Sequence, residues 1–243
     1  MKNIKIDINA DVGEGVGNES ELFPLISSCN IACGGHAGDL DSMLSVVRLA
    51  KKNKLKIGAH PSFPDKKNFG RKPMSISDDK LEKSLRDQIE SLTSILVKEN
   101  VKLNHIKPHG ALYNFGSNDQ QTARVIIGII KEMKTKLYVP YSSLISKIAI
   151  KEGVEICNEL FIDRNYNSDL SLVSRDNSNA LIQNSNEMVK HVNNIINNKI
   201  ITIDDKEISV CFDTLCIHGD NPNAVKLIKD LHLKLNAIGI EIL

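Results

Sequence analysis

The stretch LKIGAHPSFPD (residues 55–65) contains the pattern that decides the fold. Its apolar run, residues 55–59, has the length of a buried strand and leads into a polar loop stiffened by two prolines. An amphipathic helix pattern follows at residues 78–99, with Ser77 as its candidate N-cap. Residues 55–99 therefore predict one unit of strand, functional loop and helix.

The same order recurs on both sides of this unit. Further apolar runs occupy residues 4–8, 31–32, 103–107, 136–139, 154–158, 214–218 and 238–243. Further helix patterns occupy residues 41–53, 120–134, 143–152, 186–197 and 224–237. Strands that alternate with helices predict a parallel sheet. Seven or eight such units fit an α/β fold with a closed or nearly closed (β/α) barrel, and an open doubly wound sheet is the alternative.

Composition limits the function classes. The chain has 243 residues, 41% hydrophobic and 25% charged, and no linker-like segment, so we expect one domain over residues 1–243. Its net charge of +1 provides no strong positive electrostatic potential that would attract nucleic acid or an anionic membrane, so neither is expected as a partner. The first residues lack the continuous apolar stretch of a secretory signal, and the five cysteines include no C-x-x-C pair. We therefore predict a cytoplasmic protein.

Polar, glycine-containing motifs follow the apolar runs, where parallel strands present ligand sites. They are NADVGEG (9–15), NIACGGHAGD (30–39), GAHPSFPD (58–65) and KPHGALYN (107–114). From residue chemistry, His36 suits acid–base work or ligand contact, Lys107 suits polarisation of a carbonyl or binding of phosphate, and His109 suits proton transfer or metal ligation. Arg71 could clamp a carboxylate. Neither GxxxxGK[ST] nor a GxGxxG after a strand occurs, so the sequence does not indicate where a nucleotide binds.

Together, the motifs resemble those of the LamB/YcsF, or lactam-utilisation, family, which includes the A subunit of bacterial ATP-dependent 5-oxoprolinase. The resemblance rests on DINADVGEG, NIACGGHAGD, IGAHPSFPD, FGR, VKLNHIKPHGALYN, DRNY and CIHGDNP, from residue 6 to about residue 240. It implies a distorted (β/α) barrel of about seven strands, related to glycoside hydrolases and sugar deacetylases. It also implies cleavage of 5-oxo-L-proline to L-glutamate with ATP, as its Mg²⁺ complex, in an assembly with the B and C subunits of 5-oxoprolinase.

The resemblance also implies roles for the motif residues. The expected catalytic residues are Asp11, His36, His60, Lys107 and His109. The expected substrate-binding residues are Asn9, Glu14, Asn30, Asp65, Arg71, Arg164, His218 and Asp220. In this hypothesis the lactam oxygen is phosphorylated and water attacks the activated carbon. Lys107 and the first-loop amides stabilise negative charge, while Arg71 or Arg164 holds the substrate carboxylate.

A divalent metal is a separate expectation. Asp11, His60 and His109 are similar to the Asp-His-His arrangement of related carbohydrate deacetylases, which would suit a hydrolytic metal. This leaves two alternative functions open. One is a stand-alone metal-dependent amide or sugar deacetylase, and the other is a non-catalytic subunit that presents 5-oxoproline to a partner. Gly35 stands where the family usually has phenylalanine, which predicts a larger pocket.

Overall fold

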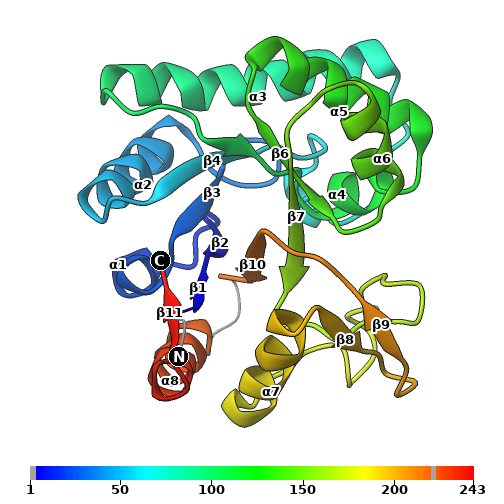
Figure 1. The fold of residues 1–243 in the computed structure, drawn as a ribbon. Coiled ribbons are helices and arrows are strands. Elements are labelled where there is room, and N and C mark those ends of the chain that lie inside the picture. Colours follow the sequence, from blue (N-terminus) through cyan, green and yellow to red (C-terminus); the bar gives the residue numbers. More distant parts are fainter. Residues whose placement is uncertain (1–3, 220–222) are drawn as a thin grey trace.

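Seven parallel strands close into a barrel in the computed structural model, which describes residues 4–219 and 223–243 (Figure 1). The strands follow one another around the barrel in the order β10-β2-β3-β4-β5-β6-β7. They are β2 (Ile8–Val12), β3 (Ser28–Ala32), β4 (Lys56–His60), β5 (His105–Ile106), β6 (Lys136–Pro140), β7 (Ile156–Phe161) and β10 (Thr214–Ile217). Because β10 pairs with both β2 and β7, the predicted closed barrel is confirmed and the open sheet is wrong.

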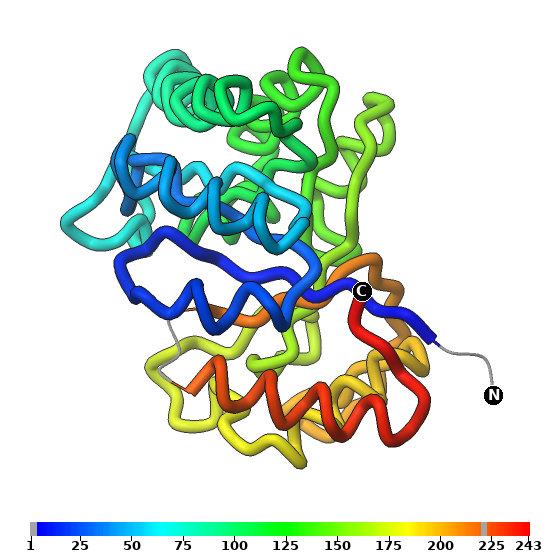
Figure 2. The backbone as a smooth tube through the Cα atoms, turned by 90° about the vertical axis from the view of Figure 1, so that its left-hand side faces the viewer, coloured from blue at the N-terminus to red at the C-terminus, as the bar shows by residue number. Residues whose placement is uncertain are grey.

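Helices pack around the outside of the barrel, as Figures 1 and 2 show. They are α1 (Glu19–Leu22), α2 (Leu40–Lys52), α3 (Asp78–Lys98), α4 (Gly110–Gly116), α5 (Gln120–Met133), α6 (Leu144–Lys151), α7 (Ser185–Ile196) and α8 (Ala224–Ala237), with short 3-10 turns η1 (Phe23–Leu25) and η2 (Lys66–Asn68). The longer helices lie within one or two residues of the predicted ranges, because an apolar stripe at helical spacing faces the barrel in each. No helix among the described residues is long and apolar enough to cross a bilayer.

Local differences from the prediction occur at the strands. The first predicted strand is divided into β1 (Ile4–Ile6), which pairs with β11 (Ile240–Ile242) beside the barrel, and β2, which belongs to it. The segment 199–209, for which no structure was predicted, forms the antiparallel pair β8 (Lys199–Ile201) and β9 (Glu207–Ser209). Ser77 precedes α3, but its side chain makes no capping hydrogen bond.

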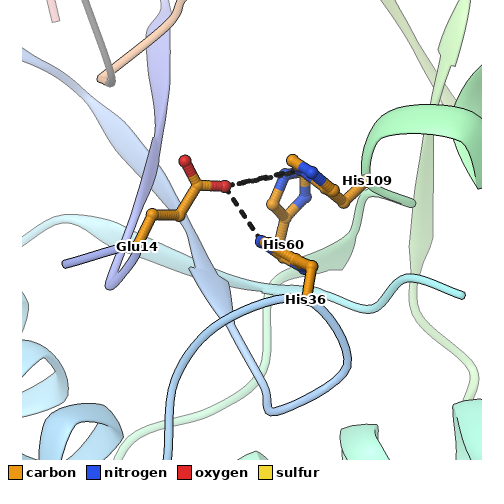
Figure 3. A group of neighbouring side chains, drawn as sticks. All are labelled: Glu14, His36, His60 and His109. Atoms are coloured by element: carbon orange, nitrogen blue, oxygen red, sulfur yellow. Dashed lines mark hydrogen bonds and ion pairs between the residues drawn. The ribbon is translucent and has the colours of Figure 1, made fainter. Parts of the chain in front are cut away.

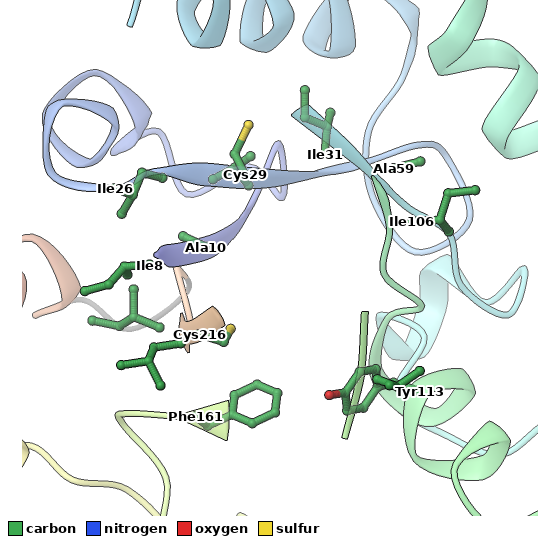
Figure 4. Close-up of a cluster of buried hydrophobic side chains, with 14 of the residues drawn as sticks. Ile8, Ala10, Ile26, Cys29, Ile31, Ala59, Ile106, Tyr113, Phe161 and Cys216 are labelled. Atoms are coloured by element: carbon green, nitrogen blue, oxygen red, sulfur yellow. The ribbon is translucent and has the colours of Figure 1, made fainter. Parts of the chain in front are cut away.

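Alternation along the barrel strands separates two kinds of side chain. Ile8, Ala10, Cys29, Ile31 and Ala59 are buried apolar residues of the core (Figure 4). Their neighbours in sequence point to the opposite face of the sheet, which in a barrel is the interior. Those neighbours include Asn9, Asp11, Asn30 and His60; in the same way His105 alternates with Ile106 and Glu159 with Leu160, and all six polar residues are buried. The barrel interior is therefore polar. Its ionisable groups lie inside the barrel, near the end that the carboxyl ends of the strands form.

Gly58 permits this interior packing. A Cβ on Gly58 would overlap the imidazole of His105, which hydrogen-bonds to Asn30 at 2.6 Å and stacks on Tyr138 with centroids 3.8 Å apart. We expect Gly58→Ala to lower the free energy of unfolding by about 1–3 kcal/mol, because a well-packed interior resists an added methyl group.

Chemical denaturation measures this effect, with Gly128→Ala as the matched control. Gly128 lies in α5, and a Cβ there would meet nothing within 4 Å. Gly128→Ala should therefore raise stability by up to about 1 kcal/mol through helix propensity. Equal effects of the two substitutions would contradict the packing argument.

Candidate functional site

Lys107 lies at the centre of the polar barrel interior, directly after β5. Its Nζ is 3.0 Å from Asp11 Oδ1, 2.9 Å from Glu159 Oε1 and 3.1 Å from Cys216 Sγ. All four residues are buried, so the ammonium is held between two carboxylates outside bulk water. Burying a charge is costly unless it is paired in this way, which makes the three ionised groups interdependent.

The pKa values of this group follow from the pairing. Burial alone would raise the pKa of the Asp11 carboxyl, but His60 and Lys107 hold that pKa well below its usual value. Burial alone would lower the pKa of Lys107, but the carboxylates of Asp11 and Glu159 raise it well above its usual value. Asp11 is therefore a carboxylate and Lys107 an ammonium at neutral pH.

Amide side chains hold these groups in place from below. Asn30 Nδ2 donates to Asn9 Oδ1 at 2.7 Å and to Asp11 Oδ1 at 2.8 Å. Asn9 Nδ2 donates to Glu159 Oε1 at 2.9 Å, and the Tyr113 hydroxyl donates to Glu159 Oε2 at 2.8 Å. Asn9 and Asn30, expected to bind substrate, therefore lie in contact with the ion pairs rather than on the cavity wall.

A second cluster, Glu14, His36, His60 and His109, lies beside Asp11 (Figure 3). His60 is the last residue of β4, and Glu14, His36 and His109 lie in the segments that follow β2, β3 and β5; one ligand atom of each lies within 4.8 Å of the others. Figure 3 shows the Glu14 carboxylate directed toward the imidazoles. Glu14 Oε1 is 3.0 Å from His36 Nε2 and 3.4 Å from His109 Nδ1.

Among residues 4–219 and 223–243, this cluster is the group of side chains that could hold a metal ion. It includes His60 and His109 of the predicted triad, and adds Glu14 and His36. Asp11, the third predicted ligand, lies at its edge, with Oδ2 3.3 Å from His60 Nε2 and Oδ1 on Lys107. Burial lowers the pKa values of His36 and His109, so both rings are neutral and can offer a lone pair.

A cavity of about 870 Å³ opens above both clusters. Asp11, Glu14, His60, Lys107 and His109 line it, together with residues 169–176 of the long loop after β7. This volume suits a small-molecule ligand. The cavity and the clusters beneath it therefore bring residues of all four motifs to one place, as the sequence predicts.

The basic residues expected to bind a carboxylate lie on the cavity wall. Arg164 is buried and donates to the backbone carbonyls of Ala180 and Val173, whereas Arg71 is exposed, with its guanidinium 4.8 Å above the Phe69 ring. Both line the cavity.

His218 lines the cavity too, and its Nδ1 lies 3.0 Å from the buried carboxylate of Asp163. Besides Asn9 and Asn30, two further expected substrate-binding residues are not placed there. Asp65 caps η2 by accepting from the Asn68 backbone N–H at 3.2 Å, and it does not line the cavity. Asp220 lies outside the described residues.

Glu159, His105 and Tyr113 belong to this network but were not among the expected site residues. The sequence offers Glu159 among the ionisable residues of ELFIDRNY, but no site role was assigned to it; the predicted strand ended at residue 158, whereas β7 continues to Phe161. The alternation of Cys157, Glu159 and Phe161 along one face would have identified it as inward-facing. Similarly, His105 lies in β5 two residues before Lys107, and side chains two residues apart in an extended chain point to the same side.

Gly35 does not enlarge the pocket, contrary to the expectation from sequence. A Cβ on Gly35 would lie 2.5 Å from Ser62 Oγ and would overlap the amide of Gln88. Gln88 Nε2 donates to the Ser62 carbonyl at 2.9 Å, and its Oε1 accepts from the Ser62 N–H at 3.0 Å. The space beside Gly35 is therefore filled by Gln88 of α3, away from the cavity.

Known proteins resemble this chain along its whole length. The sequence profile of the LamB/YcsF family matches residues 6–243. A protein of Haemophilus influenzae (strain PittEE), named as the A subunit of 5-oxoprolinase, is 39% identical over 243 aligned residues, which cover 96% of this chain and 99% of the relative. The crystal structure of a lactam utilization protein from Thermus thermophilus matches with a TM-score of 0.92 at 35% identity, covering 98% of this chain and 99% of that one.

A more distant structure shares the fold alone. A family 4 carbohydrate esterase from Streptomyces lividans matches with a TM-score of 0.54 at 9% identity, covering 99% of this chain and 92% of that one. The barrel is thus similar to that of a carbohydrate esterase, as the predicted deacetylase-like fold anticipated.

Proposed function

The chain belongs to the LamB/YcsF family, and on that premise we propose that it is the A component of an ATP-dependent 5-oxoprolinase. The observation that carries the proposal is the full-length relationship to a protein named as the A subunit of 5-oxoprolinase. The proposed reaction is ATP + 5-oxo-L-proline + 2 H₂O → ADP + phosphate + L-glutamate. The cavity supports it, because it offers charged groups of both signs to a small zwitterionic product and its lactam precursor.

The chemistry explains the need for ATP. A five-membered lactam is a stabilised amide, so opening it requires activation. Transfer of the γ-phosphoryl group to the lactam oxygen releases ADP and makes the ring carbon electrophilic. One water adds to that carbon, the C–N bond breaks, and the ring nitrogen takes a proton. The second water hydrolyses the resulting acyl phosphate to glutamate and phosphate.

We assign Lys107 to stabilising negative charge near the lactam oxygen. In the structure, its ammonium lies within hydrogen-bond distance of Asp11, Glu159 and Cys216. A thiol sulfur is a weak acceptor, so the N–H directed at Cys216 is the one that substrate oxygen would take over. The two carboxylates would keep Lys107 in place during this exchange.

Proton transfer is assigned to Asp11 or to a histidine of the neighbouring cluster. Asp11 is ionised and lines the cavity, and its contact with His60 offers a route for a proton. Arg164, Arg71 or both would bind the substrate carboxylate from the cavity wall.

ATP, as its Mg²⁺ complex, is a co-substrate in this proposal, and the B and C subunits of 5-oxoprolinase are the partners. The relative's name describes one component of a larger assembly, which supports a system of several chains. Since the sequence has no Walker A motif, a partner or a shared surface would supply the nucleotide site.

A reconstitution assay tests the proposal. Glutamate and phosphate release from 5-oxo-L-proline and ATP are measured for this chain alone, for candidate B and C partners alone, and for the mixture. We expect the mixture to turn over substrate, and neither this chain alone nor the partners alone to do so. Absence of glutamate from every mixture with folded components would reject the function.

Two further outcomes distinguish the alternatives. Amide hydrolysis by this chain alone without ATP would identify a stand-alone metal-dependent hydrolase, which the Glu14 and histidine cluster favours. A mixture that contains His60→Ala should lose glutamate production. Near-normal turnover of that mixture would instead identify a component that only presents substrate.

A further inference from the structure

Two imidazole lone pairs face each other at the cavity floor. His60 Nδ1 is 2.7 Å from the Lys107 backbone carbonyl, and His109 Nε2 is 3.0 Å from the Phe69 backbone carbonyl. A carbonyl oxygen only accepts hydrogen bonds, so each of these ring nitrogens carries the proton. With both rings in the neutral form, His60 Nε2 and His109 Nδ1 are the unprotonated nitrogens, and they lie 2.9 Å apart.

Two lone pairs at this distance repel unless a cation lies between or beside them. The nearest further donor atom of the cluster is Glu14 Oε1, 3.4 Å from His109 Nδ1 and 4.0 Å from His60 Nε2. In a tetrahedral site with bonds of about 2.0–2.1 Å, ligand atoms are separated by roughly 3.3 Å. The three observed separations, 2.9, 3.4 and 4.0 Å, lie around that value.

We propose that His60 Nε2, His109 Nδ1 and Glu14 Oε1 bind one divalent transition-metal ion. Two imidazoles and one carboxylate suit Zn²⁺, and the carbonyl acceptors behind both rings are the outer partners that metal-binding histidines usually have. This set has Glu14 in place of Asp11 of the sequence-based triad, because the ligand atoms of Glu14, His60 and His109 all lie within 4.8 Å of one another, whereas Asp11 lies at the edge of this group, with Oδ2 3.3 Å from His60 Nε2 and Oδ1 held by Lys107 and Asn30.

His36 positions Glu14 rather than binding the ion. Its Nε2 lies 3.0 Å from Glu14 Oε1, and its buried Nδ1 has no hydrogen-bond partner among the described residues. If Nε2 bound a metal, Nδ1 would carry a proton with no acceptor, which is costly in a buried place. If Nε2–H donates to Glu14, Nδ1 is only an unused lone pair. The ring also stacks on His109, with centroids 3.6 Å apart.

Three protein ligands leave a fourth position, and all three line the cavity. An ion held there would polarise an oxygen that enters the cavity, which is a property of metal sites with an open position. The metal site is independent of the proposed lactam chemistry, because it follows from the histidine geometry alone. Its test therefore needs neither ATP, nor lactam, nor partner chains.

Metal binding by the isolated full chain is the test. Protein freed of metal with a chelator is titrated with Zn²⁺ by calorimetry and with Co²⁺ by visible absorption. We expect one ion per chain, and a Co²⁺ spectrum of low-symmetry, four-coordinate type. Failure of the folded wild type to bind one equivalent of metal overturns the proposal. In that case the short contact between His60 Nε2 and His109 Nδ1 is explained by a proton that the two imidazoles share. This outcome would leave the 5-oxoprolinase assay unaffected.

Variants assign the ligands. His60→Gln and His109→Gln should each abolish one-equivalent binding, whereas His36→Gln should weaken it about 10–100-fold, as loss of an outer partner does. His232→Gln is the matched control. His232 lies on α8, outside the Glu14 and histidine cluster, and its Nε2 contacts the Leu25 carbonyl. Circular dichroism confirms that each variant is folded. Full binding by folded His60→Gln and His109→Gln proteins overturns the assignment.

Discussion

Replacing Lys107 with methionine is expected to lower the free energy of unfolding by about 3–5 kcal/mol, because breaking a buried ion pair leaves uncompensated charge. Asp11 and Glu159 would face each other in the barrel without the ammonium that now lies 3.0 and 2.9 Å from them. Methionine has a similar unbranched shape, so lost packing contributes little. Chemical denaturation measures the change.

The same substitution tests the proposed role in catalysis. If Lys107 stabilises developing negative charge, turnover of the reconstituted complex should fall about 10²–10³-fold at temperatures where the variant is folded. Unchanged turnover by a folded variant would remove Lys107 from the proposed mechanism.

Lys56→Met is the control for the stability effect. Lys56 Nζ is 3.0 Å from Asp7 Oδ2, but its side chain is 50% exposed. Solvent screens such a pair, so we expect a loss of about 0–1 kcal/mol. Similar losses for the two lysines would show that burial of the Lys107 group does not govern its contribution.

Asp11→Asn is expected to lower turnover of the reconstituted complex about 10²–10⁴-fold, the range that general acid–base catalysis contributes. Asparagine keeps the shape and one oxygen to accept from Lys107 and Asn30, but it cannot take up a proton. It also removes the negative charge beside His60. Initial rates of glutamate formation at saturating substrate measure the effect on chemistry rather than binding.

Asp39→Asn is the matched control for this charge change. Asp39 is exposed and caps α2 by accepting from the Ser42 N–H at 2.8 Å, and asparagine caps helices equally well. Its turnover should stay close to that of wild type. If Asp11→Asn also retained wild-type turnover, the base would have to be one of the neighbouring histidines.

Much of the architecture could be predicted because its signals are local. The apolar stripe of Met43, Val46, Val47 and Ala50 predicted α2, and all four are buried. Repetition of strand, loop and helix predicted a parallel barrel, and it also predicted that polar motifs would meet at one mouth, since all carboxyl ends of parallel strands lie there. The four loops are therefore neighbours for a topological reason.

The strands were predicted less well. Asn9 and Asp11 were assigned to a loop, because asparagine and aspartate are rare in strands. They lie in β2, where inward-facing partners satisfy both side chains. A barrel interior that is polar reverses the usual pattern, so composition alone misplaced the end of the strand and the start of the loop that follows it.

The sequence by itself determined the order of strands and helices, the polar loops and the set of ionisable residues available to the site. Only the tertiary structure decided which of them touch. Glu159 meets Asn9 and Lys107 from distant parts of the chain, and Glu14 rather than Asp11 completes the group with His60 and His109. Such contacts depend on closure of the barrel and on the face that each strand turns inward. Both are set by packing of the whole chain, which local periodicity does not encode.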